Sequence, residues 1–210
     1  MKRAVILVDL QGDFTECKGG ALPVPGTNWA YVKEVEEAIR RLEGQGLMIF
    51  ASQDWHPPEH VSFYTNHPGK KPFEEVELPS GRKQKLWPPH CIQGTEGAKI
   101  LVDNNLFLAV VQKGKHPHFD SYSAFRDDGG NETELDSILK FHGIRDLLIF
   151  GLATDYCVKA TAIDALERGY QVTVVLGLSR GVTPETTERA IKEMKDKGAR
   201  IVSNLSEALG

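Results

Sequence analysis

The stretch that decides the fold is "IRDLLIFGLATDYCVKATAIDALERG", residues 144–169. A short apolar run ends at a glycine, and a turn then leads into a segment of helical spacing that stops at Gly169. Apolar runs without alternation are typical of parallel strands buried on both faces. One cysteine, Cys157, stands near the start of the helix predicted over 155–169. The stretch therefore predicts a strand–turn–helix unit and leaves open whether Cys157 is a core thiol or a nucleophile.

The same alternation extends along the whole chain. Further strands are predicted at residues 3–10, 46–54, 106–114, 170–177 and 199–204. Further helices are predicted at 27–43, capped by Thr27, at 132–143, and at 183–198, capped by Thr183 with Pro184 in the first turn. Strands that alternate with helices imply right-handed crossovers. We therefore expect an α/β fold of three layers, αβα, with a six-stranded, mostly parallel sheet in a Rossmann-like order.

Composition narrows the function classes. The chain has 210 residues, 40% of them hydrophobic and 26% charged, with a net charge of −4. These values predict a single domain over 1–210. The negative net charge gives no indication of binding to nucleic acid or to an anionic membrane. The N-terminal apolar run is too short for a membrane span and no cleavage site follows it, so we expect a cytoplasmic protein. The three cysteines, Cys17, Cys91 and Cys157, are too few and too scattered for a disulfide framework or a zinc ribbon. A homo-oligomer is left open.

Four reactive side chains follow predicted strands. They are Asp9, Asp54, Lys113 and Cys157. Since the carboxyl ends of parallel strands meet at one edge of a sheet, and ligands bind there, these groups are expected to converge. A helix start and a nearby lysine would both favour the thiolate of Cys157. The alternative is that Cys157 is a buried, inert thiol, which is common for a free cysteine.

Each candidate has a neighbour that competes with it. "DLQGDF" holds two acids, Asp9 and Asp13, and the end of the strand favours Asp9 as the general base. "QKGKH" holds two lysines, Lys113 and Lys115, and Lys113 comes first after the apolar run. Either acid could instead cap a turn, and either lysine could be a solvated charge.

A second cluster lies in the irregular segment 55–105. "SQDWHPPEH" and "LWPPHC" contain the metal-ligand candidates Asp54, His56, His60 and His90. One carboxylate with two or three imidazoles suits Zn²⁺, Fe²⁺ or Mn²⁺. The alternative is that these are loop residues bonded to the backbone. The other histidines, which lack such a context, are expected at the surface: His67, His116, His118 and His142.

Aromatic residues gather in the same loops. Flat apolar walls of this kind hold planar rings, although ordinary packing is the alternative for any single residue. The candidates are Phe14, Trp87, Tyr122 and Tyr156.

Six motifs, in order, carry a resemblance to a known family. They are "VDLQGDF", "QDWHPPEH", "WPPHCIQGT", "VVQKG", "SYSAF" and "GLATDYCV". Together they resemble the nicotinamidase (pyrazinamidase) family of isochorismatase-like cysteine hydrolases, from residue 4 to about residue 202. The resemblance implies an isochorismatase-like hydrolase fold and hydrolysis of nicotinamide, and also of pyrazinamide, with release of ammonia, in NAD salvage.

The resemblance also implies roles for individual residues. Asp9, Lys113 and Cys157 would form the catalytic triad, and the backbone N–H groups of Ala153 and Cys157 would form the oxyanion hole beside a cis peptide between Leu152 and Ala153. One divalent metal ion, zinc or else iron or manganese, would bind the ring nitrogen. Its ligands would be Asp54, His56 and His90, with His60 as a further candidate. The ring contacts would be Phe14, Trp87, Tyr122 and Tyr156.

Two features depart from the family pattern. Tyr156 stands where some members carry His, and residues 69–85 form a polar insertion that we expect to be a hairpin or lid near the metal loop. Rival functions are another amidase or an isochorismatase of the same superfamily, which generally lack the metal set, and a binding module without activity. A dinucleotide binder is disfavoured because "DLQGDF" has one glycine where a Gly-rich turn is needed.

Overall fold

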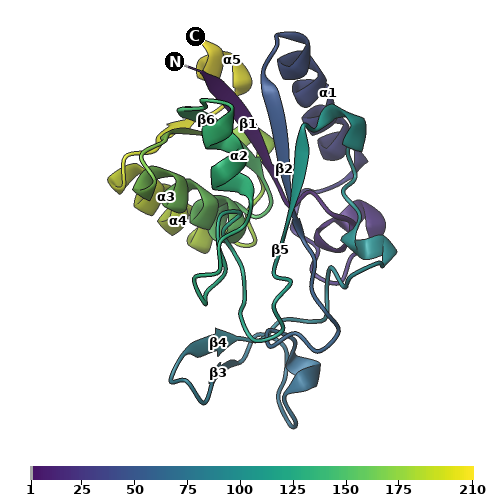
Figure 1. Cartoon of the computed structure of the whole chain (residues 1–210). Coiled ribbons are helices and arrows are strands. Elements are labelled where there is room, and N and C mark those ends of the chain that lie inside the picture. Colours follow the sequence, from purple (N-terminus) through teal and green to yellow (C-terminus); the bar gives the residue numbers. More distant parts are fainter. Residues whose placement is uncertain (1) are drawn as a thin grey trace.

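The computed structural model describes residues 2–210 and is built around one parallel sheet (Figure 1). Its strands are β1 (Arg3–Val8), β2 (Met48–Asp54), β5 (Ala109–Lys113), β6 (Asp146–Gly151), β7 (Gln171–Val175) and β8 (Arg200–Val202). In space they run β5-β2-β1-β6-β7-β8, and all neighbouring pairs are parallel. Counted among themselves along the chain, this order is third, second, first, fourth, fifth, sixth. The Rossmann-like order is therefore confirmed, with a reversal between β1 and β6.

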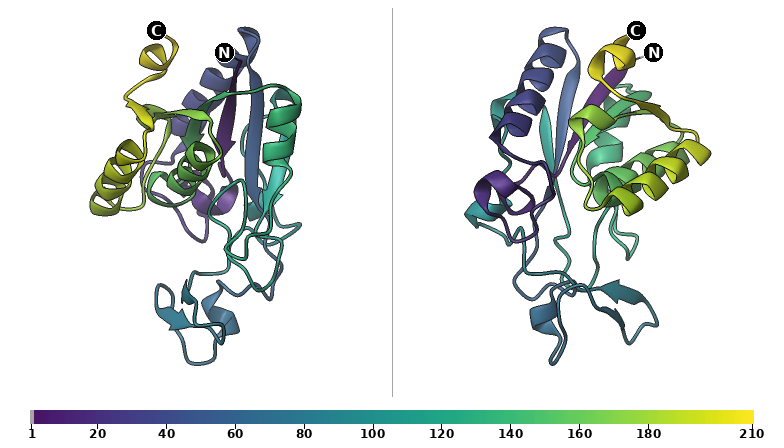
Figure 2. Two further views of the ribbon diagram at one scale, coloured as in Figure 1. Left: turned by 60° about the vertical axis from the view of Figure 1, so that its left-hand side comes forward. Right: turned by 180° about the vertical axis from the view of Figure 1, so that it is seen from behind.

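Helices cover both faces of the sheet (Figures 1 and 2). They are α1 (Trp29–Gly44), α2 (Leu135–Phe141), α3 (Lys159–Glu167), α4 (Pro184–Asp196) and α5 (Leu205–Leu209). Within residues 2–210 no helix is both long and apolar enough to cross a membrane.

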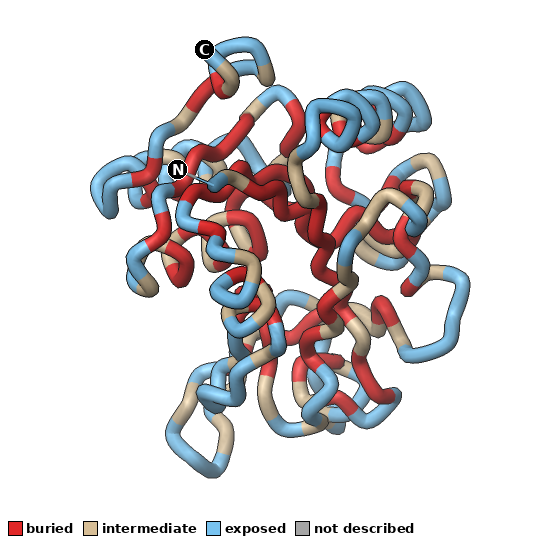
Figure 3. The backbone as a smooth tube through the Cα atoms, turned by 45° about the horizontal axis from the view of Figure 1, so that its top comes forward, coloured by how far each residue is buried: buried red, intermediate tan, exposed pale blue. Residues whose placement is uncertain are grey.

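Two apolar cores sandwich the sheet, because successive side chains of a strand point to opposite faces. Val5 and Leu7 of β1 belong to the core that includes α1 and α5. Ala4 and Ile6 belong to the core that includes α2, α3 and α4. Figure 3 shows the buried residues concentrated along these central strands. The continuous apolar runs in the sequence are thus explained by burial on both faces.

Some helix ends differ from the sequence prediction. Asn28, not Thr27, caps α1 by accepting the N–H of Tyr31, whereas Thr27 accepts the N–H of Glu16. Thr27 is buried against that earlier loop, a contact that local sequence does not reveal. Thr183 caps α4 as predicted. The short helix α5 was not predicted.

The helix predicted over 155–169 begins differently. One π-helical turn, Thr154–Val158, precedes α3, so Cys157 lies inside that turn.

The polar insertion forms a hairpin that projects beyond the site end of the sheet (Figure 1). Its strands are β3 (Glu75–Glu77) and β4 (Lys83–Lys85), which pair antiparallel. Arg82 donates to the His118 carbonyl at 2.6 Å, and Gln84 donates to the Asp120 carboxylate at 2.8 Å. These bonds anchor the expected hairpin to the loop that follows β5.

At the point where the strand order reverses, β6 ends in Gly151, a position that leaves no room for a side chain unless the backbone moves. Gly151 has φ +132°, and a Cβ there would lie 2.1 Å from the carbonyl oxygen of Val8. The close approach of β1 and β6 therefore depends on the missing side chain.

Gly151→Ala is expected to lower the free energy of unfolding by about 3 kcal/mol or more, because backbone must move to admit the methyl group. Urea denaturation measures the change. Gly143→Ala is the matched control, since Gly143 also has positive φ but nothing lies within 4 Å of its Cβ position. The control should lose about 1 kcal/mol, the cost of placing an L-residue in the left-handed conformation. Equal losses in the two variants would contradict the contact argument.

Candidate active site

Three side chains from three different strands meet at the carboxyl edge of the sheet. Asp9 follows β1, Lys113 ends β5, and Cys157 lies in the turn after β6. The Lys113 ammonium lies 2.9 Å from Asp9 Oδ2 and 3.6 Å from Cys157 Sγ, and all three residues are buried. Lys115, in contrast, is exposed and faces Glu134 at 3.8 Å. The structure thus brings together the acid, the lysine and the thiol that the sequence favoured.

The backbone of Asp9 is held in an unusual conformation. Its φ of +44° is in the left-handed region, which persists in a non-glycine residue only where the surroundings impose it. Ser52 donates to Asp9 Oδ1 at 2.6 Å. Asp9 Oδ2 faces the ammonium as an ion pair but lacks hydrogen-bond geometry, so this oxygen keeps a lone pair available. Asp13 points elsewhere and accepts the N–H of Cys91.

Burial controls the proton affinities of the three groups. It raises the pKa of the Cys157 thiol well above its usual value and also raises the pKa of Asp9, in both cases against the opposing charge of Lys113. Burial alone would lower the pKa of Lys113, but Asp54 and Asp9 outweigh it and raise that pKa. The resting site therefore holds a protonated thiol beside a charged lysine. Burial therefore opposes the lowering of the thiol pKa that was expected from the helix start.

A second cluster joins one carboxylate and two imidazoles. Asp54 Oδ2 lies 3.3 Å from His56 Nε2 and 3.9 Å from His90 Nε2, and all three residues are buried. Their ligand atoms lie within 4.8 Å of one another. One carboxylate oxygen and two imidazole nitrogens form a donor set suited to Zn²⁺, Fe²⁺ or Mn²⁺.

The two histidines are oriented as metal ligands would be. His56 Nδ1 lies 2.9 Å from the Gly114 carbonyl, and His90 Nδ1 lies 2.7 Å from the Pro88 carbonyl. A carbonyl can only accept, so each Nδ1 carries a proton, and the neutral form of each ring presents its lone pair at Nε2. His56 Nε2 is buried without a hydrogen-bond partner. A cation among the three ligand atoms would satisfy it, so the residues fit a metal ion.

His60 is placed beside this cluster in a different way. Its ring stacks on His56 at 4.1 Å between centroids. Its Nδ1 lies 2.7 Å from Ser62 Oγ and its Nε2 lies 3.0 Å from the Phe119 carbonyl. Both nitrogens are thus engaged by the chain, and His60 would have to break one of these contacts to bind a metal. Of the other histidines, His116 and His118 are exposed as expected, whereas His67 and His142 are half-buried.

Asp54 belongs to both clusters. Its Oδ1 accepts from Lys113, while its Oδ2 faces the histidines. Gln11, which was not predicted as a site residue, fixes the backbone of Asp54. The Gln11 side chain donates to the Asp54 carbonyl and accepts the Asp54 N–H, both at 2.8 Å. The position of Gln11, two residues after Asp9 at the end of a buried strand, is the one local sign of a role in the site. Its partner Asp54 lies 43 residues away, so the contact cannot be read from local sequence.

The turn that carries Cys157 is held on both sides. The peptide between Leu152 and Ala153 is cis, as expected. Asp155 is buried and accepts the N–H of Val182 at 3.0 Å, together with the hydroxyl of Thr186. The turn is therefore tied to the first turn of α4, and this structural role of Asp155 was not predicted.

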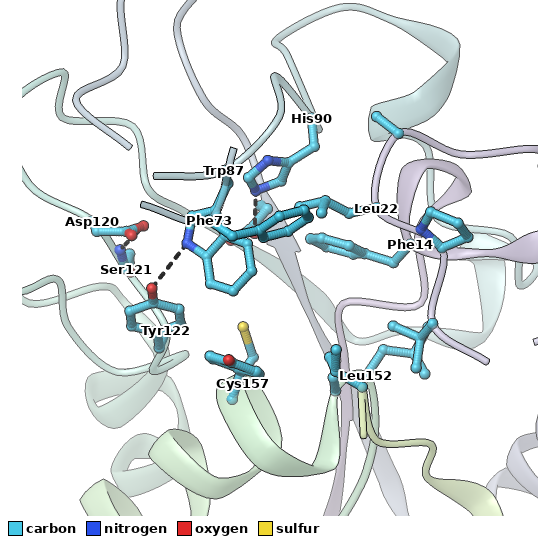
Figure 4. Close-up of a pocket in the computed structure, with 17 residues that line it drawn as sticks. Phe14, Leu22, Phe73, Trp87, His90, Asp120, Ser121, Tyr122, Leu152 and Cys157 are labelled. Carbon is cyan, nitrogen blue, oxygen red and sulfur yellow. Dashed lines mark hydrogen bonds and ion pairs between the residues drawn. The ribbon is translucent and has the colours of Figure 1, made fainter. Parts of the chain in front are cut away.

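A cavity of about 210 Å³ opens above the Cys157 sulfur (Figure 4). This volume is below the ~300–1,000 Å³ of drug-sized pockets and suits one small ring. Trp87 Nε1 donates to the Tyr122 hydroxyl at 3.0 Å, and Trp87 meets Tyr156 edge-on at 5.2 Å. His90 and Cys157 both line the cavity. So do all four of the predicted aromatic residues, which are Phe14, Trp87, Tyr122 and Tyr156.

The insertion contributes two residues that sequence reasoning missed. Phe73 lines the cavity, packs edge-on against Trp87 and is 57% exposed. Lys85 lies behind the wall, with its ammonium 5.1 Å from the Trp87 ring centroid and 3.4 Å from the Tyr156 hydroxyl. The insertion therefore contributes Phe73 to the cavity wall and places Lys85 behind it.

Comparisons with known proteins agree with this geometry. The Isochorismatase domain model matches residues 3–205. A nicotinamidase of Escherichia coli is 44% identical, with 95% of this chain and 93% of that protein covered. A nicotinamidase–pyrazinamidase structure from Acinetobacter baumanii superposes with a TM-score of 0.87 at 37% identity, covering 100% and 98% of the two chains. A Pyrococcus horikoshii pyrazinamidase in complex with zinc gives 0.80 at 38% identity, covering 97% and 100%. This chain belongs to the isochorismatase family, among the nicotinamidases.

Proposed function

We propose that this protein is a nicotinamidase, a cysteine hydrolase that converts nicotinamide to nicotinate and ammonia in NAD salvage and also accepts pyrazinamide. The observation that carries the proposal is one cavity that joins two clusters. Cys157 lines the cavity and contacts Lys113, which in turn pairs with Asp9, while Asp54 and His90 of the carboxylate–imidazole group line the same cavity. A small aromatic ring with a carboxamide would contact both clusters at once.

The reaction begins with the protonated thiol. Asp9 takes the proton from Cys157, and the charge of Lys113 stabilises the thiolate. The sulfur attacks the carboxamide carbon, the C–N bond breaks, and Asp9 returns the proton to the departing ammonia. Water, deprotonated by Asp9, then attacks the thioester, which releases the carboxylic acid and restores the thiol.

Two backbone groups would hold the oxyanion of each tetrahedral intermediate. These are the N–H groups of Ala153, which directly precedes the π-helical turn, and of Cys157, which lies within it; both residues line the cavity. Donors fixed by the backbone stabilise charge without reorganising during the reaction. The ties of Asp155 to Val182 and Thr186 support this turn.

The metal ion would be held by Asp54, His56 and His90. When bound, a divalent ion there would supply a Lewis-acid contact to the ring nitrogen and so orient the ring. Zinc is favoured by the two imidazoles and one carboxylate, with iron or manganese as alternatives. The aromatic residues Trp87, Tyr122 and Tyr156 would confine the ring, with Phe14 on the opposite wall.

Two rival functions remain on the same fold. A binding module without activity is disfavoured because Asp9, Lys113 and Cys157 are all in contact distance. An isochorismatase or carbamoyl amidase is disfavoured by the buried carboxylate–imidazole cluster beside the cavity.

The first prediction concerns the nucleophile. Purified protein of measured metal content should release ammonia from nicotinamide, and Cys157→Ala should abolish the release, because no other thiol lines the cavity. Cys17→Ala is the control, since Cys17 lies outside the cavity and should leave the rate unchanged. Metal-loaded wild type that leaves nicotinamide intact but cleaves a carbamoyl amide would favour the rival amidase.

The second prediction concerns Lys113. Its charge opposes the rise of the Cys157 pKa, so Lys113→Met should raise that pKa further. Each added pKa unit means about tenfold less thiolate at a given pH. Alkylation of Cys157 by iodoacetamide at pH 8 should therefore slow by about tenfold or more, measured by mass spectrometry of the Cys157 peptide. Circular dichroism checks the fold, and an unchanged rate in a folded variant would refute the electrostatic role.

The third prediction separates ring binding from other metal roles. If the metal contacts the ring nitrogen, chelation should raise the KM for nicotinamide and leave benzamide turnover, which has no ring nitrogen, unchanged. Readdition of Zn²⁺, Fe²⁺ or Mn²⁺ should restore the KM. Equal loss of kcat for both amides would instead indicate that the metal acts on the attacking water or on the fold.

A further inference from the structure

The second acid of "DLQGDF", Asp13, is not used by the mechanism above, yet its side chain is specifically engaged. Asp13 Oδ2 accepts the N–H of Cys91 at 2.7 Å, across 78 residues of sequence. Cys91 directly follows His90, is fully buried, and has φ +47°. A non-glycine residue holds this conformation only where its surroundings fix it. The Asp13 carboxylate supplies such a constraint one residue from a proposed metal ligand.

The space around the Asp13 carboxylate is closed on its other side. A Cβ added at Gly97 would lie 2.2 Å from Asp13 Oδ1. The glycine therefore allows the carboxylate to reach the Cys91 amide, and any side chain at Gly97 would push it away.

The same segment also positions the ring wall. Phe14 follows Asp13, and its ring lies 5.4 Å from the His90 ring between centroids. The Asp13 carbonyl accepts the N–H of Leu22 at 2.8 Å, and Leu22 and Phe14 both line the cavity. Asp13 thus joins the loop that carries His90 to the wall that the substrate ring would contact.

We infer that Asp13 is a positioning residue, which acts through the Cys91 amide to aim His90 Nε2 at the metal and at the cavity. This inference rests on the proposed metal centre. His90 is held by contacts on both sides along the chain. Its Nδ1 bonds to the Pro88 carbonyl, and the N–H of the next residue, Cys91, donates to Asp13. The Cys91 carbonyl also accepts the N–H of His56 at 3.0 Å, so loss of the Asp13 contact is expected to loosen the turn at Cys91 and the distance from His90 to Asp54.

The test measures Zn²⁺ affinity by competition with a chromogenic chelator. Asp13→Ala should weaken Zn²⁺ binding about 10-fold to 100-fold, the usual effect of removing a group that orients a metal ligand. Asp13→Asn keeps one oxygen that can accept the Cys91 N–H, so it should lose much less. Gly97→Ala should reproduce the loss of Zn²⁺ affinity although residue 13 is still an aspartate, because the new methyl group displaces the carboxylate. Excess Zn²⁺ should restore the activity of Asp13→Ala.

Asp146→Ala is the control for general destabilisation. Asp146 is a buried acid that pairs with Arg3 at 2.6 Å, at the opposite end of β6 from the site. It should lower stability in urea and leave Zn²⁺ affinity unchanged. Equal Zn²⁺ affinity in Asp13→Ala and wild type would overturn this inference alone. Wild type that binds no Zn²⁺ would overturn the metal centre and this inference with it.

Discussion

The buried carboxylate of Asp54 is the contact on which both halves of the site depend. One of its oxygens accepts from Lys113 and the other faces His56 Nε2 at 3.3 Å. Asp54 and Lys113 are register partners across β2 and β5, so the sheet itself sets this contact. Breaking a buried ion pair by removing one partner costs about 3–5 kcal/mol, because the remaining charge stays buried. The parallel register of β2 and β5 therefore fixes how far Lys113, which contacts the Cys157 thiol, lies from Asp54, which faces the histidines.

The charges of this group do not balance within the chain. Two buried carboxylates, Asp9 and Asp54, face one buried ammonium, Lys113. Burial raises the pKa of Asp9 and of the Cys157 thiol, Lys113 opposes the rise, and Asp54 adds to it in both cases. A divalent cation at Asp54 would offset the excess negative charge, and the orphaned Nε2 of His56 is aimed where it would sit. Electrostatics thus supports the metal proposal independently of the similarity to a zinc-bound relative.

The sequence predicts the sheet well because each central strand is buried on both faces and reads as an apolar run. The convergence of Asp9, Asp54, Lys113 and Cys157 follows from the parallel direction alone, since carboxyl ends share one edge. What local pattern does not reveal are contacts between distant segments. The bond of Gln11 to Asp54, the hold of Asp155 on Val182 and the entry of Phe73 into the cavity all depend on tertiary packing.

The pKa of Cys157 also depends on tertiary packing. A helix start favours the thiolate, whereas burial raises the pKa of the Cys157 thiol and favours the neutral form. Burial also raises the pKa of Asp9, so the base becomes stronger where the acid becomes weaker. Burial thus strengthens Asp9 as the proposed base and weakens Cys157 as the acid, so it acts in opposite senses on the two partners of the transfer. The proposed mechanism therefore requires Asp9 and Lys113 to generate the Cys157 thiolate at the moment of attack.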